Sequence, residues 1–300
     1  MGDDKAAHND AQTILAKAKA IADEQGVQAT TLIVTGDTAS VFVELSHNYN
    51  LIVIGNRGKG GLAERMLGTT SSSLPAAAYC PVVVIPYTDD SGKVMHLNNR
   101  IRRVVVGADE SRWGVKAIET AAEFADHWGA MLTVLSAVPN LTSMTGTGAS
   151  GIDNSEQNSV MESYLEDLRS SIRPLHRKYP NLNITESVVE GSAIEALTQA
   201  SKDNDVVVVG SRGRGGFTGL IFGAVSRGLI QHAVGPVYVV PRKYVESAES
   251  ESEEGTAQTA ENVPEVPLES VKGIQEVSIS QADDNTAKGL SDIIDPPDRP

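Results

Sequence analysis

Two glycine-rich tracts, each directly after an apolar run, are the residues of this chain best suited to chemistry. Residues 55–61 read Gly-Asn-Arg-Gly-Lys-Gly-Gly and follow the run 51–54, and residues 210–216 read Gly-Ser-Arg-Gly-Arg-Gly-Gly and follow the run 206–209. Glycines let the backbone approach an anion closely and point N–H groups at it, and a helix that begins just beyond adds the positive end of its dipole. The pattern predicts phosphate binding, and hence a nucleotide, at up to two places.

The two tracts belong to a longer internal repeat. Gly55 and Gly210 lie 155 residues apart (210 − 55), and this register aligns residues 34–86 with residues 189–241 without a gap. Of those 53 pairs 17 are identical, including pairs well outside the glycine tracts, such as Pro81 with Pro236. We interpret the repeat as one duplicated domain.

Composition bounds the class of protein. At 300 residues and 40% hydrophobic residues the chain is long enough for about two globular domains. It contains no apolar run of membrane-spanning length and no secretory leader, so we expect a cytoplasmic protein with no membrane partner. The only cysteine, Cys80, is expected to be a small buried filler.

The net charge of −14 is concentrated in the C-terminal tail. Residues 246–300 carry 14 acids against Lys272, Lys288 and Arg299, a net charge of −11. The tail has no aromatic residue and few aliphatic ones, so we expect it to be disordered, either as a solubilising appendage or as a docking arm. Its acidity disfavours nucleic acid as a partner.

Alternating strand and helix patterns place the second tract at a sheet edge. We predict strands at 103–107, 131–138, 183–190, 205–209 and 237–240, and helices at 115–128, 155–179, 192–200 and 225–233, with Pro174 kinking or dividing the second helix. The order implies an α/β fold with a parallel sheet covered on both faces, whose ligands bind beyond the carboxyl ends of the strands. Asp109 follows the first strand and would lie across from the glycine tract, where it could bind a ribose or base, or cap the helix near Trp113.

These motifs resemble the universal stress protein family, in its tandem ATP-binding form, over about residues 1–241. That branch shows Gly-x-x-Gly, nine residues, then Gly-Ser/Thr. The first copy matches throughout, from Gly55 to Thr69, whereas the second copy has Ala224 where the hydroxyl is expected and Ser226 two residues later. The Asp-x-Ser segment after the first strand and the Pro-Val-x-Val-x-Pro endings at Pro81 and Pro236 extend the resemblance.

The resemblance implies two tandem doubly wound units, with strand order 3-2-1-4-5 in the second, and ATP, with or without Mg²⁺, along the carboxyl edge. It also implies that the units pair through their last strands, with Val82 and Val84 facing Val237 and Val239; a further homo-oligomer stays open. The implied nucleotide-binding residues are Gly107, Asp109, Ser111, Gly210, Ser211, Arg212, Gly213, Arg214, Gly215, Gly216, Gly223, Ala224, Val225 and Ser226, together with Gly55, Gly58, Gly68, Thr69 and Ser71 in the first copy.

The first copy departs from the family at its beginning. The 155-residue register places Met1 opposite Glu156, so the first unit has no counterpart of residues 103–155, including Asp109. A truncated start explains this more economically than a natural half-domain, and the loss should leave a gap between its third and fourth strands. We therefore expect a partial unit at 1–88, a linker at 89–100, a complete unit at 101–244 and the tail at 245–300, with the second site the better candidate.

Other motifs fit less well. Residues 58–63 satisfy a dinucleotide fingerprint only formally, because that fingerprint opens a first strand-helix unit. A Walker loop needs Gly-Lys-Ser/Thr, but Lys59 precedes Gly60, and the six histidines show no metal spacing. The basic residues Arg57, Lys59, Arg212 and Arg214 could reach phosphates or could simply be solvated.

Three functions remain open. The first is a nucleotide-binding regulatory protein of the stress response with no catalytic residues. The second is a slow ATP-hydrolysing enzyme on the same fold, ranked lower because no general base or metal carboxylate pair stands out. The third is an interaction module that has lost nucleotide binding.

Overall fold

The computed structural model describes residues 2–56, 67–86, 100–109, 111–138, 154–213, 222–253 and 274–275. The chain divides into two compact units, Thr38–Glu261 and a second made of Met1–Asp37 with Asn262–Pro300. In the smaller unit α1 (Gly2–Glu24) precedes β1 (Ile33–Val34), which pairs antiparallel with β9 (Ile274–Gln275).

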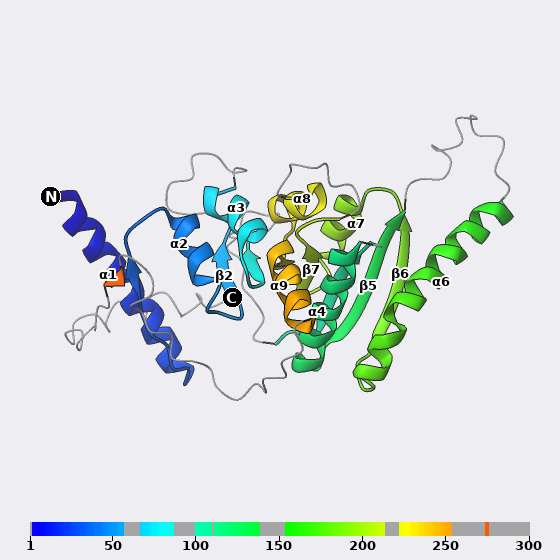
Figure 1. The fold of residues 1–300 in the computed structure, drawn as a ribbon, viewed down its shortest axis with the longest axis horizontal. Helices are drawn as coiled ribbons and strands as arrows, with labels where there is room; N and C mark the ends of the chain where they lie inside the picture. The colour runs from blue at the N-terminus through cyan, green and yellow to red at the C-terminus, as the bar shows by residue number, and fades with distance from the viewer. Residues whose placement is uncertain are drawn as a thin grey trace, which may run out of the picture. The chain divides into compact units, whose positions relative to one another are not determined.

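The larger unit is built on a seven-stranded sheet (Figure 1). Its strand order is β2-β3-β8-β7-β4-β5-β6. Read from β6, the last five strands have the order 3-2-1-4-5 and are parallel, which confirms the predicted topology of the second unit. The strands are β2 (Ile52–Gly55), β3 (Val82–Ile85), β4 (Arg103–Ala108), β5 (Met131–Val138), β6 (Ile184–Glu190), β7 (Val206–Gly210) and β8 (Val237–Val240).

The internal repeat is also a repeat of elements. Adding 155 to the bounds of an element in the first copy gives the bounds of its counterpart in the second. This holds without a shift at either end for α2 (Thr38–Leu45) and α7 (Ala193–Ala200), for α3 (Thr69–Ala77) and α8 (Ala224–His232), and for β3 and β8. The two copies meet where β3 pairs antiparallel with β8, Val82 opposite Val239 and Val84 opposite Val237. One sheet thus runs continuously through both copies, joined by the valines expected to face each other.

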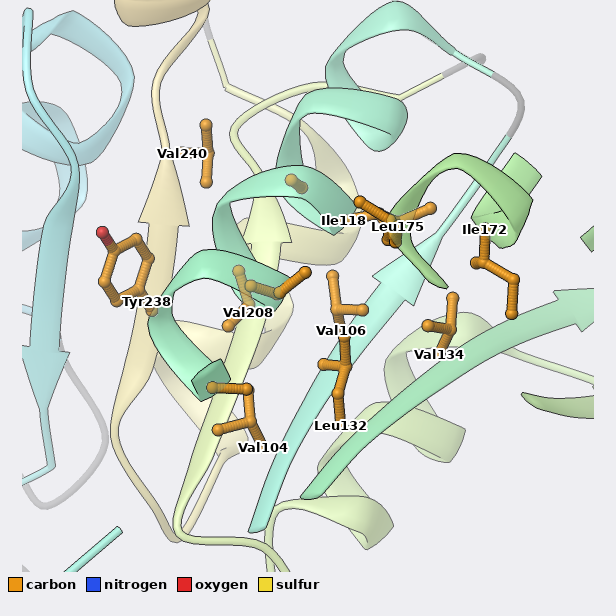
Figure 2. Close-up of a cluster of buried hydrophobic side chains, with 14 of the residues drawn as sticks. Val104, Val106, Ile118, Leu132, Val134, Ile172, Leu175, Val208, Tyr238 and Val240 are labelled. Carbon is orange, nitrogen blue, oxygen red and sulfur yellow. The ribbon is translucent and has the colours of Figure 1, made fainter. Parts of the chain in front are cut away.

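Alternation along the strands separates two cores. Val104 and Val106 of β4 face a cluster with α4 (Arg112–Trp128) and α6 (Asn154–Lys178), which Figure 2 shows. Val105 between them faces the opposite cluster, to which α3, α7 and α8 contribute Leu74, Leu197 and Leu229. Around β4 the sheet is therefore covered on both faces, as parallel strands with continuous apolar runs require.

Helix α4 has clear sequence signals at both ends. Ser111 is its N-cap, with its Oγ accepting a hydrogen bond of 3.0 Å from Gly114 N. Gly129 follows the last turn at φ 60°, a left-handed conformation that glycine adopts without steric cost. Its alanines, from Ala117 to Ala125, are buried and let the helix lie close to the sheet.

The predicted gap in the first copy does not form inside the sheet. Strand β1 is the counterpart of part of β6, but it pairs with β9, and both strands belong to the smaller unit. Strand β2 is the edge strand of the seven-stranded sheet. In the complete copy the equivalent strand β6 pairs with β5, and the first copy has no counterpart of β5 for β1 to join. Val53 of β2 is 55% exposed because the first copy has no counterpart of α4. Its repeat partner Val208 is covered by α4 and is fully buried.

Two further expectations need correction. Helix α6 is not divided at Pro174 but continues through it as one element, with Leu168 and Ile172 before the proline and Leu175 after it buried in the core. Helix α9 (Arg242–Glu253) extends into the segment expected to be disordered from residue 245, because Val245 is buried in the same core. Apart from residues 274–275, the tail beyond 253 lies outside the described residues.

Candidate functional site

A cavity of about 460 Å³ opens at the carboxyl ends of β4, β5 and β7. The chain leaves β4 toward β5 and β6 on one side, and β7 leads to β8 on the other, so the cavity lies at the point where the strand order reverses. In open parallel sheets this switch point is where ligands bind. Its lining residues are Gly107, Ala108, Asp109, Gly114, Leu135, Ala137, Ala193, Leu197, Val209, Gly210, Arg212, Gly213, Phe222, Gly223, Ala224, Val225 and Ser226.

Asp109 is held in place by the residue that caps α4. Its Oδ1 accepts hydrogen bonds from Ser111 N at 3.1 Å and from Ser111 Oγ at 2.5 Å. Ser111, not Asp109, then accepts from Gly114 N as the N-cap. The capping role considered for Asp109 therefore falls to Ser111, and Asp109 orients the capping hydroxyl while lining the cavity.

Two glycines lie against the two oxygens of this carboxylate. A Cβ added at Gly114 would collide with Asp109 Oδ1, and one added at Gly213 would collide with Oδ2. Gly114 belongs to the first turn of α4, and Gly213 belongs to the glycine tract after β7. The carboxylate thus lies between the helix and the tract, and only residues without side chains allow this approach.

Gly210 and Gly223 bring further backbone into close contact. A Cβ at Gly210 would lie 3.0 Å from Arg212 O and 3.2 Å from Trp113 O. A Cβ at Gly223 would lie 3.2 Å from Ser211 O and 3.3 Å from Ser226 Oγ. Both glycines therefore let neighbouring protein segments pack closely beside the cavity, where a side chain would not fit.

The hydroxyl of Ser226 connects the two ends of the glycine motif. Ser211 O accepts hydrogen bonds from Gly223 N at 2.8 Å and from Ser226 Oγ at 3.2 Å. The first copy repeats this arrangement, with Asn56 O accepting from Gly68 N at 3.1 Å and from Ser71 Oγ at 2.9 Å. Ser226 and Ser71 thus have a structural role that their place in the motif did not predict.

The electrostatics of the cavity favour an anion near α8. Gly223 is the N-cap of α8 and offers no side-chain acceptor to the first turn. The first helical hydrogen bond runs from Arg227 N to Gly223 O, so the preceding N–H groups of the turn have no acceptor within the helix. The Arg212 side chain adds a positive charge beside the tract and packs over the Trp113 ring at 5.8 Å from its centroid.

Most of the residues predicted for the second site come together. The cavity is lined by Gly107, Asp109, Gly210, Arg212, Gly213 and residues 223–226. Ser111 and Ser211 do not line it: Ser111 donates to Asp109, and Ser211 accepts from Arg242 N. The predicted residues Arg214, Gly215 and Gly216 lie outside the described residues.

The residues predicted for the first copy lie elsewhere in the sheet. Gly55 ends β2, Gly68 is the N-cap of α3, Thr69 begins that helix, and Ser71 is buried within it. None of these four residues lines the cavity, and Gly58 lies outside the described residues.

Several lining residues were not predicted. Leu135 and Ala137 come from the end of β5, Ala193 and Leu197 from α7, and Phe222 precedes the N-cap of α8. The spacing of these apolar residues is that of ordinary core positions, so no motif marks them. Only the topology, which puts the end of β5 next to β4, could have identified Leu135 and Ala137.

Metal-binding clusters and membrane-spanning helices are both absent from the residues that the structure describes. No group of three or more His, Cys, Asp or Glu side chains there could hold a metal ion. No helix in that part of the chain is long and apolar enough to cross a membrane.

Comparison with known proteins identifies one family. The model of the universal stress protein family matches residues 1–86 and 100–241. A universal stress protein of Mycolicibacterium smegmatis is 29% identical over 223 residues, covering 74% of this chain and 72% of the relative. One from Mycobacterium tuberculosis is 33% identical over 207 residues, covering 69% of this chain and 66% of the relative.

A solved structure agrees in fold. The crystal structure of a universal stress protein from Archaeoglobus fulgidus has a TM-score of 0.54 at 21% identity. The match covers 78% of this chain and 77% of that one.

Proposed function

The chain belongs to the universal stress protein family, and on that premise we propose that the cavity beside β4 and β7 binds ATP. The protein would then act as a nucleotide-binding regulator in the cytoplasm during stress. The observation that carries this proposal is the meeting of Asp109 with Gly213. It brings a hydrogen-bond acceptor for a sugar and a glycine backbone for phosphates to one cavity.

The residues around Asp109 fit the adenosine half of the ligand. A carboxylate accepts hydrogen bonds from ribose hydroxyls, as acidic residues do in other nucleotide-binding sheets. Leu135, Ala137 and Val209 give this part of the cavity an apolar lining that suits a base.

The glycine motif fits the phosphate half. Gly210, Gly213 and Gly223 line the cavity and let the tract pack closely against its neighbours, and the first turn of α8 offers N–H groups at the positive end of its dipole. Arg212 adds a full positive charge. Mg²⁺ bound together with ATP would be coordinated in part by the phosphate oxygens.

The second copy differs from the family pattern at one position that matters. Ala224 lies where a hydroxyl is expected, and the hydroxyl of Ser226 already donates within the protein. The phosphates would therefore rely on backbone N–H groups and Arg212.

Titration calorimetry of the full chain with ATP tests the proposal. Wild type should bind one ATP, and Asp109→Asn should lower the affinity about tenfold, as loss of a hydrogen bond to a charged group does. Asp205→Asn is the matched control, because Asp205 Oδ2 accepts from Arg102 N and Arg103 N at 2.8 and 2.9 Å but does not line the cavity. Absence of ATP binding by folded wild type would refute the proposal, and release of ADP would favour the enzyme instead.

A further inference from the structure

Helix α9 begins where the family match ends, at residue 241, and yet it packs into the core of the unit. Val245 is 2% exposed and lies in the cluster that includes Val240 and Tyr238. Tyr244 packs against the same cluster. The first turns of this helix are therefore an integral part of the larger unit.

The N-terminus of α9 is capped by a residue of the glycine tract. Pro241, which precedes the helix, has no side-chain acceptor for the first N–H groups. Arg242 N donates instead to Ser211 Oγ at 2.9 Å, and Ser211 is fully buried. A serine 31 residues away thus performs the task of an N-cap side chain.

Ser211 joins this cap to the cavity. Its N donates to Val240 O at 2.8 Å, and its O accepts from Gly223 N and Ser226 Oγ. Its neighbours Gly210 and Arg212 both line the cavity. A displacement of α9 would therefore act on both ends of the glycine motif through one residue.

A second chain of contacts runs from α9 to the cavity along the surface. Glu246 accepts a hydrogen bond from Arg112 Nη2 at 3.1 Å, and the Arg112 guanidinium packs over the Trp113 ring at 5.0 Å from its centroid. Arg212 packs over the same ring. Because Arg112 and Glu246 are half exposed, their ion pair contributes little energy and mainly orients the side chains.

We infer that α9 positions the glycine tract for ligand binding, with Ser211 as the positioning residue that transmits its placement. The inference rests on the proposed function for the identity of the ligand, ATP. It adds that a helix outside the family match sets the affinity of the site. Binding is reciprocal, so a ligand that needs the tract in place must in turn stabilise α9.

Hydrogen exchange and ATP titration of full-length variants test this inference. Ser211→Ala removes the acceptor for Arg242 N, and Val245→Ala loosens α9 without altering the cavity lining. Both should speed amide exchange in residues 242–247 and at Gly223, whose N–H donates to Ser211 O, and weaken ATP binding about fivefold or more. ATP should slow exchange in residues 242–247 of wild type, an effect that a purely structural role would not produce.

Ser201→Ala is the matched control. Ser201 is 3% exposed, and its Oγ accepts from Val234 N at 3.1 Å, but it lines no part of the cavity. This variant should lose stability without selective change at α9 or in ATP affinity.

The outcomes separate the two proposals. Equal exchange at α9 and equal ATP affinity in Ser211→Ala and Ser201→Ala would overturn the inference. If wild type binds no ATP, the proposed function fails, whereas the positioning role of α9 is decided by amide exchange at Gly223 in the same variants.

Discussion

Asp109 and Gly213 are in contact across the carboxyl edge of the sheet, so closely that Oδ2 of the aspartate takes the space of a Cβ at the glycine. The two residues come from loops after different strands, β4 and β7, more than a hundred residues apart. Their contact is possible only because those strands are neighbours, with Val106 opposite Val208.

Gly213→Val should weaken ATP binding about tenfold or more, because the new side chain must displace either the Asp109 carboxylate or the tract. Calorimetric titration of the purified variant measures this loss. Gly58→Val is the control, since Gly58 is the repeat partner of Gly213 in the copy that lacks an Asp109 counterpart. An affinity that falls only in the Gly58 variant would place the site in the first copy.

Ala224→Thr should strengthen ATP binding about fivefold, because it supplies a hydroxyl at the first residue of α8, next to the cavity. The comparison is again an affinity measurement against wild type. Thr69→Ala makes the reverse change at the matching position of α3 and should leave the affinity unaltered. Failure of the threonine to improve binding would mean that the phosphates do not reach α8.

Val84→Ala should destabilise the larger unit by about 2 kcal/mol, because Val84 is 1% exposed and lies opposite Val237 where the two copies join. Denaturant unfolding followed by circular dichroism measures the change. Val53→Ala, at a valine 55% exposed on the edge strand, should cost no more than about 0.5 kcal/mol. Equal losses in the two variants would argue against β3–β8 pairing in solution.

Cys80 should resist alkylation in the folded protein. Burial raises its thiol pKa from 9.0 to about 11, only partly opposed by a backbone hydrogen bond, so almost none of the reactive thiolate exists at pH 8. Mass spectrometry after iodoacetamide treatment should show modification only once denaturant is added. Rapid labelling of the native protein would contradict this burial.

The raised pKa of Cys80 also makes the stability of the folded protein depend on pH. Because the folded-state pKa is the higher one, the contribution of Cys80 is fully present below pH 9 and is lost as the pH rises through about 11. Cys80→Ala should therefore lose less stability than wild type as the pH rises from 9 to about 11, and its ATP affinity should be unchanged.

Much of the fold could be predicted because its signals are local. Valine runs at 104–106 and 206–209, the capping serine Ser192 and the repeat of 155 residues indicated the strands, helices and their order. The extent of α9 could not be predicted, because its acidic composition is that of a solvated tail, whereas tertiary contacts such as the burial of Val245 hold it.

The amino-acid sequence by itself determined that this is a duplicated α/β protein with glycine tracts after its strands, because hydrophobic period, capping residues and repeats act over short distances along the chain. Only the tertiary structure decided that Asp109 lies against Gly213, that Leu135 and Leu197 line the same cavity, and that Ser211 caps α9. The reason is that these contacts depend on which strands are neighbours and on close packing between distant segments, neither of which leaves a periodic pattern in the sequence.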